Sequence, residues 1–148
     1  MKAIHYLHFL IITITIMFSS CKPNVEDPEE NNTNTQIGFF YAENGSSNLT
    51  KADDAVANKQ YNTLIAKKNN QTVIEINLSD FKTGAHSLSS KYAFTYVKDG
   101  KHWEATAGSL QITKNDGSKI SGTYEATAGT GVTGVSVVKG NFADIPLN

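Results

Sequence analysis

Apolar and polar residues alternate in short runs from Ile37 to the end of the chain, and turn-forming residues separate the runs. In the clearest run, Ile120, Gly122, Tyr124 and Ala126 occupy one side and polar residues occupy the other. A period of two belongs to a β-strand with one buried face, whereas a helix repeats about every 3.6 residues. The pattern therefore predicts an all-β domain.

Two turn signals predict β-hairpins. Asp99-Gly100 follows the alternating run at 92–97, so a return strand is expected through Trp103. Asn115-Asp116-Gly117 leads from the preceding apolar run into the strand at 120–127. Asp-Gly pairs favour the tight turns that connect antiparallel strands, because their backbones adopt positive φ angles readily.

The same alternation predicts further strands. A strand at 61–66 is expected to pair with one at 72–79, and a glycine-rich loop is expected at 127–134. Pro146 has no N–H to donate to a sheet, so the final strand must place it at an edge. The remaining strands are expected at 37–41, 110–112, 135–137 and 142–147.

Residues 50–57 do not follow the alternation. Thr50 to Asp53 fits a helix capping box, and Ala52, Ala55 and Val56 are spaced for a short apolar stripe. Gly45 and the neighbouring asparagines suit a loop instead, so helix and loop both stay open. With eight or nine strands and no helix of three turns, we expect an antiparallel β-sandwich, with a small closed, lipocalin-like barrel as the alternative.

The first 20 residues differ in kind from the rest. Lys2 precedes an apolar stretch from Leu7 to Phe18, and the small residues Ser19 and Ser20 follow it. This order predicts a secretory signal peptide over 1–20. Twelve apolar residues reach only ~18 Å as a helix, which is too short for a hydrocarbon core of ~30 Å.

Phe18-Ser19-Ser20-Cys21 resembles the lipobox of bacterial lipoproteins, although Phe18 replaces the usual leucine and Ser20 the usual glycine or alanine. The resemblance implies that Cys21 is acylated and becomes the mature N-terminus. Two or more acyl chains would anchor the protein stably, since each buried methylene contributes about 0.8 kcal/mol. Lys22, where an aspartate would retain the protein, resembles lipoproteins sorted to the outer membrane of diderm bacteria.

Residues 21–35 combine prolines, acids and an Asn/Thr run with a single aliphatic residue, which predicts a disordered acidic tether before one all-β domain at 36–148. Glu26, Asp27, Glu29 and Glu30 lie a few residues past Cys21. Such a cluster resembles the export signals of surface lipoproteins. We therefore expect the cell surface as the location, with the periplasmic face as the alternative.

The composition excludes several classes of function. The chain contains no arginine, and after the leader it carries twelve lysines against fourteen acids, so nucleic acid is not an expected partner. Only His86 and His102 remain after the leader, and Cys21 is the one cysteine. A multi-histidine or thiolate metal site is therefore excluded, and no cofactor is expected.

Trp103, between His102 and Glu104, is the most prominent candidate for binding a ligand, because an exposed indole stacks on sugar rings. In a half-buried strand a lone tryptophan more simply fills the core. Tyr92 and Tyr96 are added as possible ligand-binding residues, on the condition that they line a concave opening with Trp103.

The acidic residues predict no catalytic pair. Asp99 and Asp116 are assigned to turns, Glu75 and Glu125 to outward strand faces, and Asp144 to bonding nearby backbone groups. We therefore expect no catalytic residues and no enzyme activity.

Residues 61–148 carry a succession of motifs: an apolar strand Ile74 to Leu78, a turn Gly84 to Leu88, a hairpin Gly108 to Tyr124 and a closing Gly140 to Ile145. The succession resembles a family of small uncharacterised all-β lipoprotein domains of diderm bacteria. The resemblance implies an all-β fold and assigns no activity.

These observations together predict an outer-membrane lipoprotein that acts as a non-enzymatic binding or structural module of the cell envelope. Its expected partners are the membrane, through the lipid anchor, and an envelope protein or glycan. A glycan- or lipid-binding β-barrel lipoprotein is the alternative.

Overall fold

The computed structural model describes residues 36–148, so the predicted leader at 1–20, Cys21 and the tether up to residue 35 lie outside the described residues. The described part contains eleven β-strands. They are β1 (Gly38–Glu43), β2 (Thr50–Lys51), β3 (Asp54–Asn58), β4 (Thr63–Lys68), β5 (Gln71–Asn77), β6 (Gly84–Ser87), β7 (Phe94–Lys98), β8 (Lys101–Glu104), β9 (Ala107–Asn115), β10 (Lys119–Thr127) and β11 (Val137–Pro146). Within 36–148 no helix is long and apolar enough to span a bilayer.

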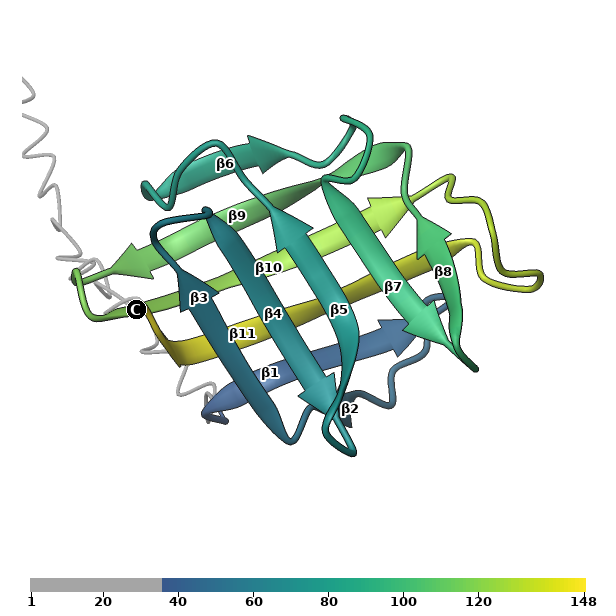
Figure 1. Cartoon of the computed structure of the whole chain (residues 1–148), viewed down its shortest axis with the longest axis horizontal. Coiled ribbons are helices and arrows are strands. Elements are labelled where there is room, and N and C mark those ends of the chain that lie inside the picture. Colours follow the sequence, from purple (N-terminus) through teal and green to yellow (C-terminus); the bar gives the residue numbers. More distant parts are fainter. Residues whose placement is uncertain (1–35) are drawn as a thin grey trace, which may run out of the picture. The chain divides into compact units, whose positions relative to one another are not determined.

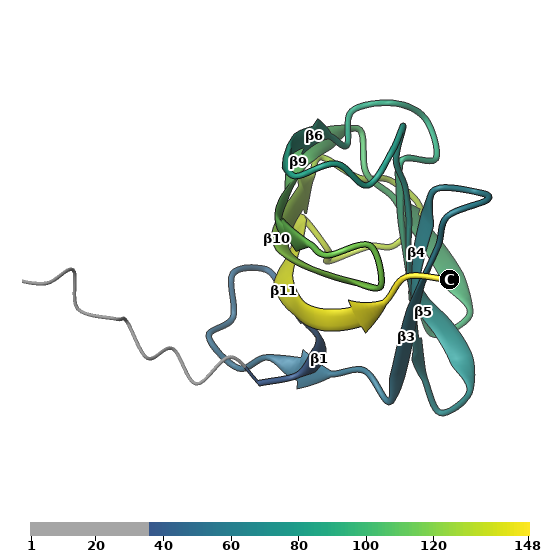
Figure 2. The ribbon, with the colours of Figure 1, turned by 90° about the vertical axis from the view of Figure 1, so that its left-hand side faces the viewer.

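The strands form two antiparallel sheets that are not closed into a barrel, which confirms the predicted β-sandwich. The six-stranded sheet has the order β2-β1-β11-β10-β9-β6, and the five-stranded sheet has the order β3-β4-β5-β7-β8. Figure 1 shows the strands of one sheet crossing those of the other steeply. Figure 2 shows the two layers from the side, with the six-stranded sheet curved around the core.

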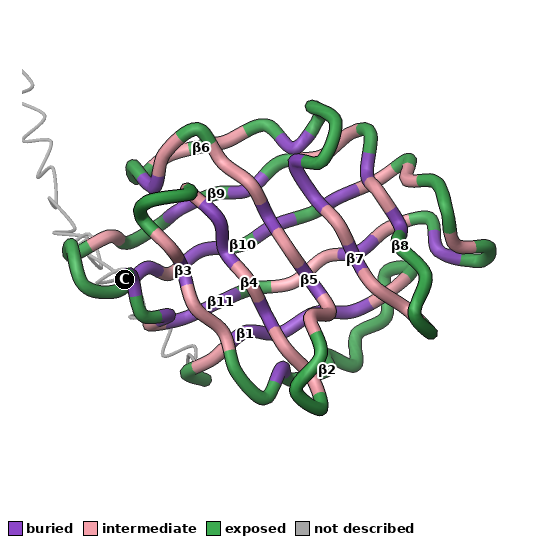
Figure 3. The backbone as a smooth tube through the Cα atoms, in the orientation of Figure 1, coloured by how far each residue is buried: buried purple, intermediate pink, exposed green. Residues whose placement is uncertain are grey.

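The core lies between the inward faces of the two sheets. In β10 the residues Ile120, Gly122, Tyr124 and Ala126 are buried while their neighbours face solvent, as the alternation predicts. Figure 3 shows buried positions alternating with intermediate ones along β5 and β7. The two predicted hairpins are present as β7–β8 and β9–β10.

Two glycines in the six-stranded sheet make room for aromatic rings. Tyr124 reaches across Gly140 of β11, and its hydroxyl donates a 3.0 Å hydrogen bond to the Phe40 carbonyl in β1. A Cβ at Gly140 would collide with that carbonyl oxygen. Phe142 covers Gly122 in the same way. The aromatic rings thus occupy space that side chains at positions 122 and 140 would otherwise fill.

Residues 50–57 are neither helix nor simple loop, so both readings left open for this segment were wrong. Its residues form β2 and β3, and Ala57 is fully buried opposite Leu64 of β4. The Asp53 carboxylate accepts bonds from the Asn69 N–H and the Lys68 ammonium, at 2.7 Å each, instead of capping a helix. Partners distant in sequence therefore decide the conformation.

Three other predictions need correction. The strand count exceeds the expected eight or nine, partly because the segment beginning at Gly84 is the strand β6 and not a turn. β7 begins at Phe94, since Tyr92 has a φ of 65° and lies outside it. The last strand is ten residues long and central. The pairing of β11 with β1 ends at Ala143, however. On the side of β11 that faces β1, Pro146 therefore has no neighbouring strand, as a proline requires.

Two of the four sheet edges, those of β3 and β8, receive backbone hydrogen bonds from other segments. The C-terminus pairs with β3 through Asn148 N–H to Ala57 O at 2.8 Å. Thr130 exchanges two 3.0 Å bonds with Glu104 at the edge of β8. At the third edge, β2 is only two residues long, and the Ala52 N–H just after it donates to Phe39 O of β1 at 2.8 Å. Among the edges of the described sheets, β6 is the longer of the two whose outer side has no backbone partner.

A partly buried ion pair also links the two sheets. Glu43 at the end of β1 accepts a 2.6 Å hydrogen bond from the Tyr96 hydroxyl and pairs with Lys98, both on β7. Burial alone would raise the pKa of the Glu43 carboxyl, but the bonds from Lys98 and Tyr96 outweigh it and hold the pKa below its usual value.

Because this pKa is lower in the folded state, ionised Glu43 stabilises the fold at pH values above the usual carboxyl pKa. The stabilisation is lost as pH falls through the lowered pKa of the folded state. Glu43→Gln is expected to lower the free energy of unfolding by about 1–2 kcal/mol at pH 7. The deficit should shrink toward pH 3 in urea titrations. Glu125→Gln, on the exposed outer face of β10, is the control. A deficit independent of pH would refute this account.

Candidate functional site

Trp103 lies in the core and not at a surface. Its side chain is 0% exposed, and its indole N–H donates a 3.0 Å bond to the Val135 carbonyl. One side of the ring contacts the backbone at Gly129, and Phe94 meets it edge-on with centroids 6.2 Å apart. The indole therefore has no open face on which a sugar ring could stack.

The other two aromatic candidates are separated from each other. Tyr96 stands opposite Trp103 in the β7–β8 pairing and is buried, with its hydroxyl bonded to Glu43. Tyr92 is 53% exposed and lies on a different part of the molecule. The structure thus brings Trp103 and Tyr96 together in the core, and it leaves Tyr92 alone at a groove.

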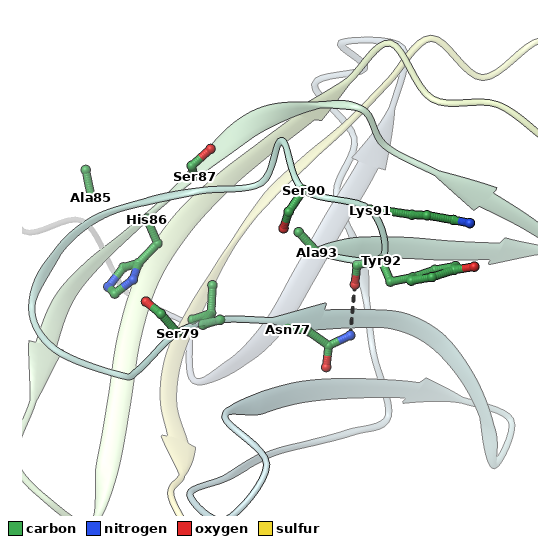
Figure 4. Close-up of a pocket in the computed structure, with 10 residues that line it drawn as sticks. Asn77, Ser79, Ala85, His86, Ser87, Ser90, Lys91, Tyr92 and Ala93 are labelled. Carbon is green, nitrogen blue, oxygen red and sulfur yellow. Dashed lines mark hydrogen bonds between the residues drawn. The ribbon is translucent and has the colours of Figure 1, made fainter.

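That groove has a volume of about 620 Å³ and runs beside β6. One wall is β6 itself, the end of β5 forms the floor, and the segment before β7 forms the far wall. Figure 4 shows His86 pointing toward Ser79, while Lys91 and Tyr92 lie farther along. The lining residues are Asn77, Leu78, Ser79, Ala85, His86, Ser87, Ser90, Lys91, Tyr92 and Ala93. We call this set the β6 groove.

Hydrogen bonds hold the walls of the β6 groove in place. The Asn77 side-chain amide donates to the Tyr92 carbonyl at 2.9 Å, which ties the far wall to β5. His86 Nε2 lies 2.8 Å from the Lys82 carbonyl oxygen, which accepts a hydrogen bond from it. The Lys91 ammonium lies 4.7 Å from the centroid of the Tyr92 ring, as in a cation–π contact. The groove therefore offers one cation, an imidazole and several hydroxyls.

The free edge of β6 faces this groove. Leu88 N–H donates to Gly108 O at 3.0 Å, so in the antiparallel ladder every second residue of β6 bonds to β9. His86 is one of these. Ala85 and Ser87 fall on the alternate positions, so their N–H and C=O groups point away from β9. Within residues 36–148 no hydrogen bond to these outward groups is present.

A second hollow, of about 360 Å³, lies on the outer face of the six-stranded sheet. Gln111, Thr123 and Asn141 stand next to one another on β9, β10 and β11. Leu49, from the segment between β1 and β2, adds an apolar wall. Amide and hydroxyl groups in a row suit a ligand rich in hydroxyls, but no aromatic ring is exposed there to stack on it.

Two of the acidic residues considered in the sequence, Asp144 and Asp116, make structural contacts. Asp144 does not bond nearby backbone groups through its carboxylate, which pairs instead with Lys114 at 2.9 Å. Its φ of 52° places it at a β-bulge, where its N–H donates to Ser121 Oγ at 3.0 Å. Asp116 caps its own turn by accepting bonds from Ser118 and Lys119. Among residues 36–148 no three His, Cys, Asp or Glu side chains gather as metal ligands do.

Comparison with family models, curated proteins and solved structures found no match to this chain. The family resemblance over 61–148 therefore stays a prediction. Any functional conclusion rests on the sequence and on the geometry of the grooves.

Sequence reasoning missed the β6 groove because its residues carry no distinctive pattern. β6 is four residues long and polar, and its best signal is the brief alternation of Ala85, His86, Ser87 and Leu88. Such a run reads equally well as a turn. Only its pairing with β9 identifies it as an edge strand.

Trp103 is the one tryptophan of the chain, so its fluorescence tests its place in the core. We expect native emission to be blue-shifted from that of the unfolded protein and poorly quenched by acrylamide. Trp103→Phe should cost about 1–3 kcal/mol of stability, because the Val135 carbonyl loses its donor. Tyr92→Phe, at an exposed side chain, should change stability by less than about 0.5 kcal/mol. Ready quenching of the native protein would contradict the burial.

Proposed function

We propose that this protein is a lipid-anchored, non-enzymatic binding module of the bacterial outer membrane, displayed from an acylated Cys21 and binding its partner at the β6 groove. The observation that carries the proposal is the open β6 edge beside the groove. Of the other described edges, β3 and β8 bond to segments of the same chain, and β2 is only two residues long.

The membrane attachment is supported by the lipobox-like Phe18-Ser19-Ser20-Cys21 after a short apolar stretch. The described domain exposes four large apolar residues, Ile37, Leu49, Tyr61 and Tyr92. Stable binding to a bilayer needs far more buried apolar area than scattered side chains supply. Acyl chains on Cys21 would supply that area without any help from the sandwich.

Binding is supported over catalysis by the chemistry of the groove. Its lining includes Lys91, His86 and serine hydroxyls, and no carboxylate is among the lining residues. The His86 ring is held by the Lys82 carbonyl and not by a carboxylate that would tune it as a base. Open backbone groups beside a shallow polar groove suit recognition of another chain.

A glycan-binding function is the second candidate, favoured by the row of Gln111, Thr123 and Asn141 on the outer face. Retention on an immobilised polysaccharide that is lost in Gln111→Ala would favour this candidate. Equal retention of Gln111→Ala and wild type would remove it. A lipid-binding interior has no support, because core side chains fill the space between the sheets.

The anchor is tested by Cys21→Ser in cells fed an alkyne-tagged palmitate. Wild type should incorporate the label and fractionate with membranes, whereas Cys21→Ser should do neither, because serine cannot form the thioether. Ser20→Gly, which moves the site toward the commonest lipobox, is the matched control and should keep the label. Palmitate labelling of Cys21→Ser, or recovery of the wild-type protein in the aqueous phase, would contradict the proposal.

The same cells show on which side the domain lies. Protease added to intact cells should degrade the sandwich if the acidic residues after Cys21 direct it to the surface. Full protection, with degradation only after the outer membrane is opened, would place it on the periplasmic face.

A further inference from the structure

We propose that β6 accepts an extended segment of a partner protein as a seventh strand of the six-stranded sheet, and that a carboxylate on this segment binds Lys91. The inference deepens the proposed function and rests on it. It names the class of partner and the way in which that partner is held.

Backbone groups supply the first part of the recognition. The N–H and C=O groups of Ala85 and Ser87 point out of the sheet, which is two donors and two acceptors at alternate positions. An added strand would lie about 4.8 Å away and satisfy all four. An extended peptide is the ligand whose own donors and acceptors repeat with this spacing.

The surroundings leave room for such a strand. The groove of about 620 Å³ lies along the free edge, and Leu78 and Ala93 contribute apolar surface at its floor. The side chains of an added strand would alternate between this floor and solvent. Natural sheets commonly protect a free edge with an inward-pointing charge, a proline or a covering loop. None of the four residues of β6 is charged or a proline.

The positive charge of Lys91 favours some partner segments over others. Lys91 is the one lysine of the lining, and no lining residue is a carboxylate, although Glu104 of β8 attracts it from outside the groove. Lys82, the preceding lysine in the sequence, already has a carboxylate partner, since Asp80 lies 3.3 Å away. The Tyr92 ring holds Lys91 at the rim. A segment with an acidic residue gains attraction there, whereas a basic segment meets a like charge.

A second copy of this chain is a weaker occupant. Pairing β6 with β6 of another molecule would place two identical grooves against each other. Each copy would also bring its own Lys91 to the shared groove, with no carboxylate from the lining to balance it.

The test measures binding of a fluorescent ten-residue peptide of alternating valine and threonine with two glutamates to the mature lipidated protein in detergent micelles. Ala85→Pro removes one outward N–H and blocks the edge, and it leaves the bonds to β9 intact. It should weaken binding about tenfold or more. Ala85→Thr keeps the N–H and is the matched control, which should bind like wild type.

Two further arms keep the result interpretable if Ala85→Pro fails to fold. The same peptide with every backbone nitrogen methylated should not bind wild type, because neither of its edges can then donate hydrogen bonds to β6. Lys91→Glu should reverse the preference for the glutamate peptide over its lysine counterpart. Equal binding to Ala85→Pro and Ala85→Thr, or full binding of the methylated peptide, would overturn strand addition.

Self-association of wild type that Ala85→Pro abolishes would also overturn the proposed partner class, since the occupant would then be a second copy. Labelling at Cys21 and sensitivity to protease do not depend on these measurements. If they hold and the peptide does not bind, strand addition fails and the anchored module stands. If Cys21→Ser still carries palmitate, the proposed function fails whatever the peptide does.

Discussion

A continuous chain of aromatic contacts joins the two sheets, and the rest of the sandwich depends on it. From β8 to β11 the rings follow one another as Trp103, Phe94, Tyr124, Phe39 and Phe142, with successive centroids 5.2 to 6.2 Å apart. The chain begins in the five-stranded sheet and ends in the six-stranded one. Because large rings fill the middle of the core, the sheets cannot slide past each other without opening cavities.

This packing explains why the interior is not a binding site. The rings occupy the space that a barrel of similar size would offer to a ligand, and Gly140 and Gly122 have no side chains that would compete with them. A ligand would therefore have to bind at the periphery. β6 contributes none of the five rings, and its outer side is unpaired, so it is the strand most available to a partner.

The proposed lipid anchor is compatible with binding at the open edge of β6. A lipid on Cys21 would hold the sandwich near the membrane without using its surface, and the groove would stay accessible. Confinement at a surface also raises the effective concentration of a binding site for a partner in the same membrane. A short edge strand with modest affinity would then be sufficient.

The sequence alone determined the strands that alternate strongly and the hairpins with Asp-Gly turns, because period and turn chemistry are local properties. It also carries the lipobox-like motif around Cys21. Tertiary structure decided the rest. Thr50 to Asn58 became strands because β1 and β4 offer partners, and β6 became an edge because β9 pairs with it. Only folding placed Trp103 and Tyr96 in the core and left Tyr92 at the groove, since burial depends on which distant segments pack together.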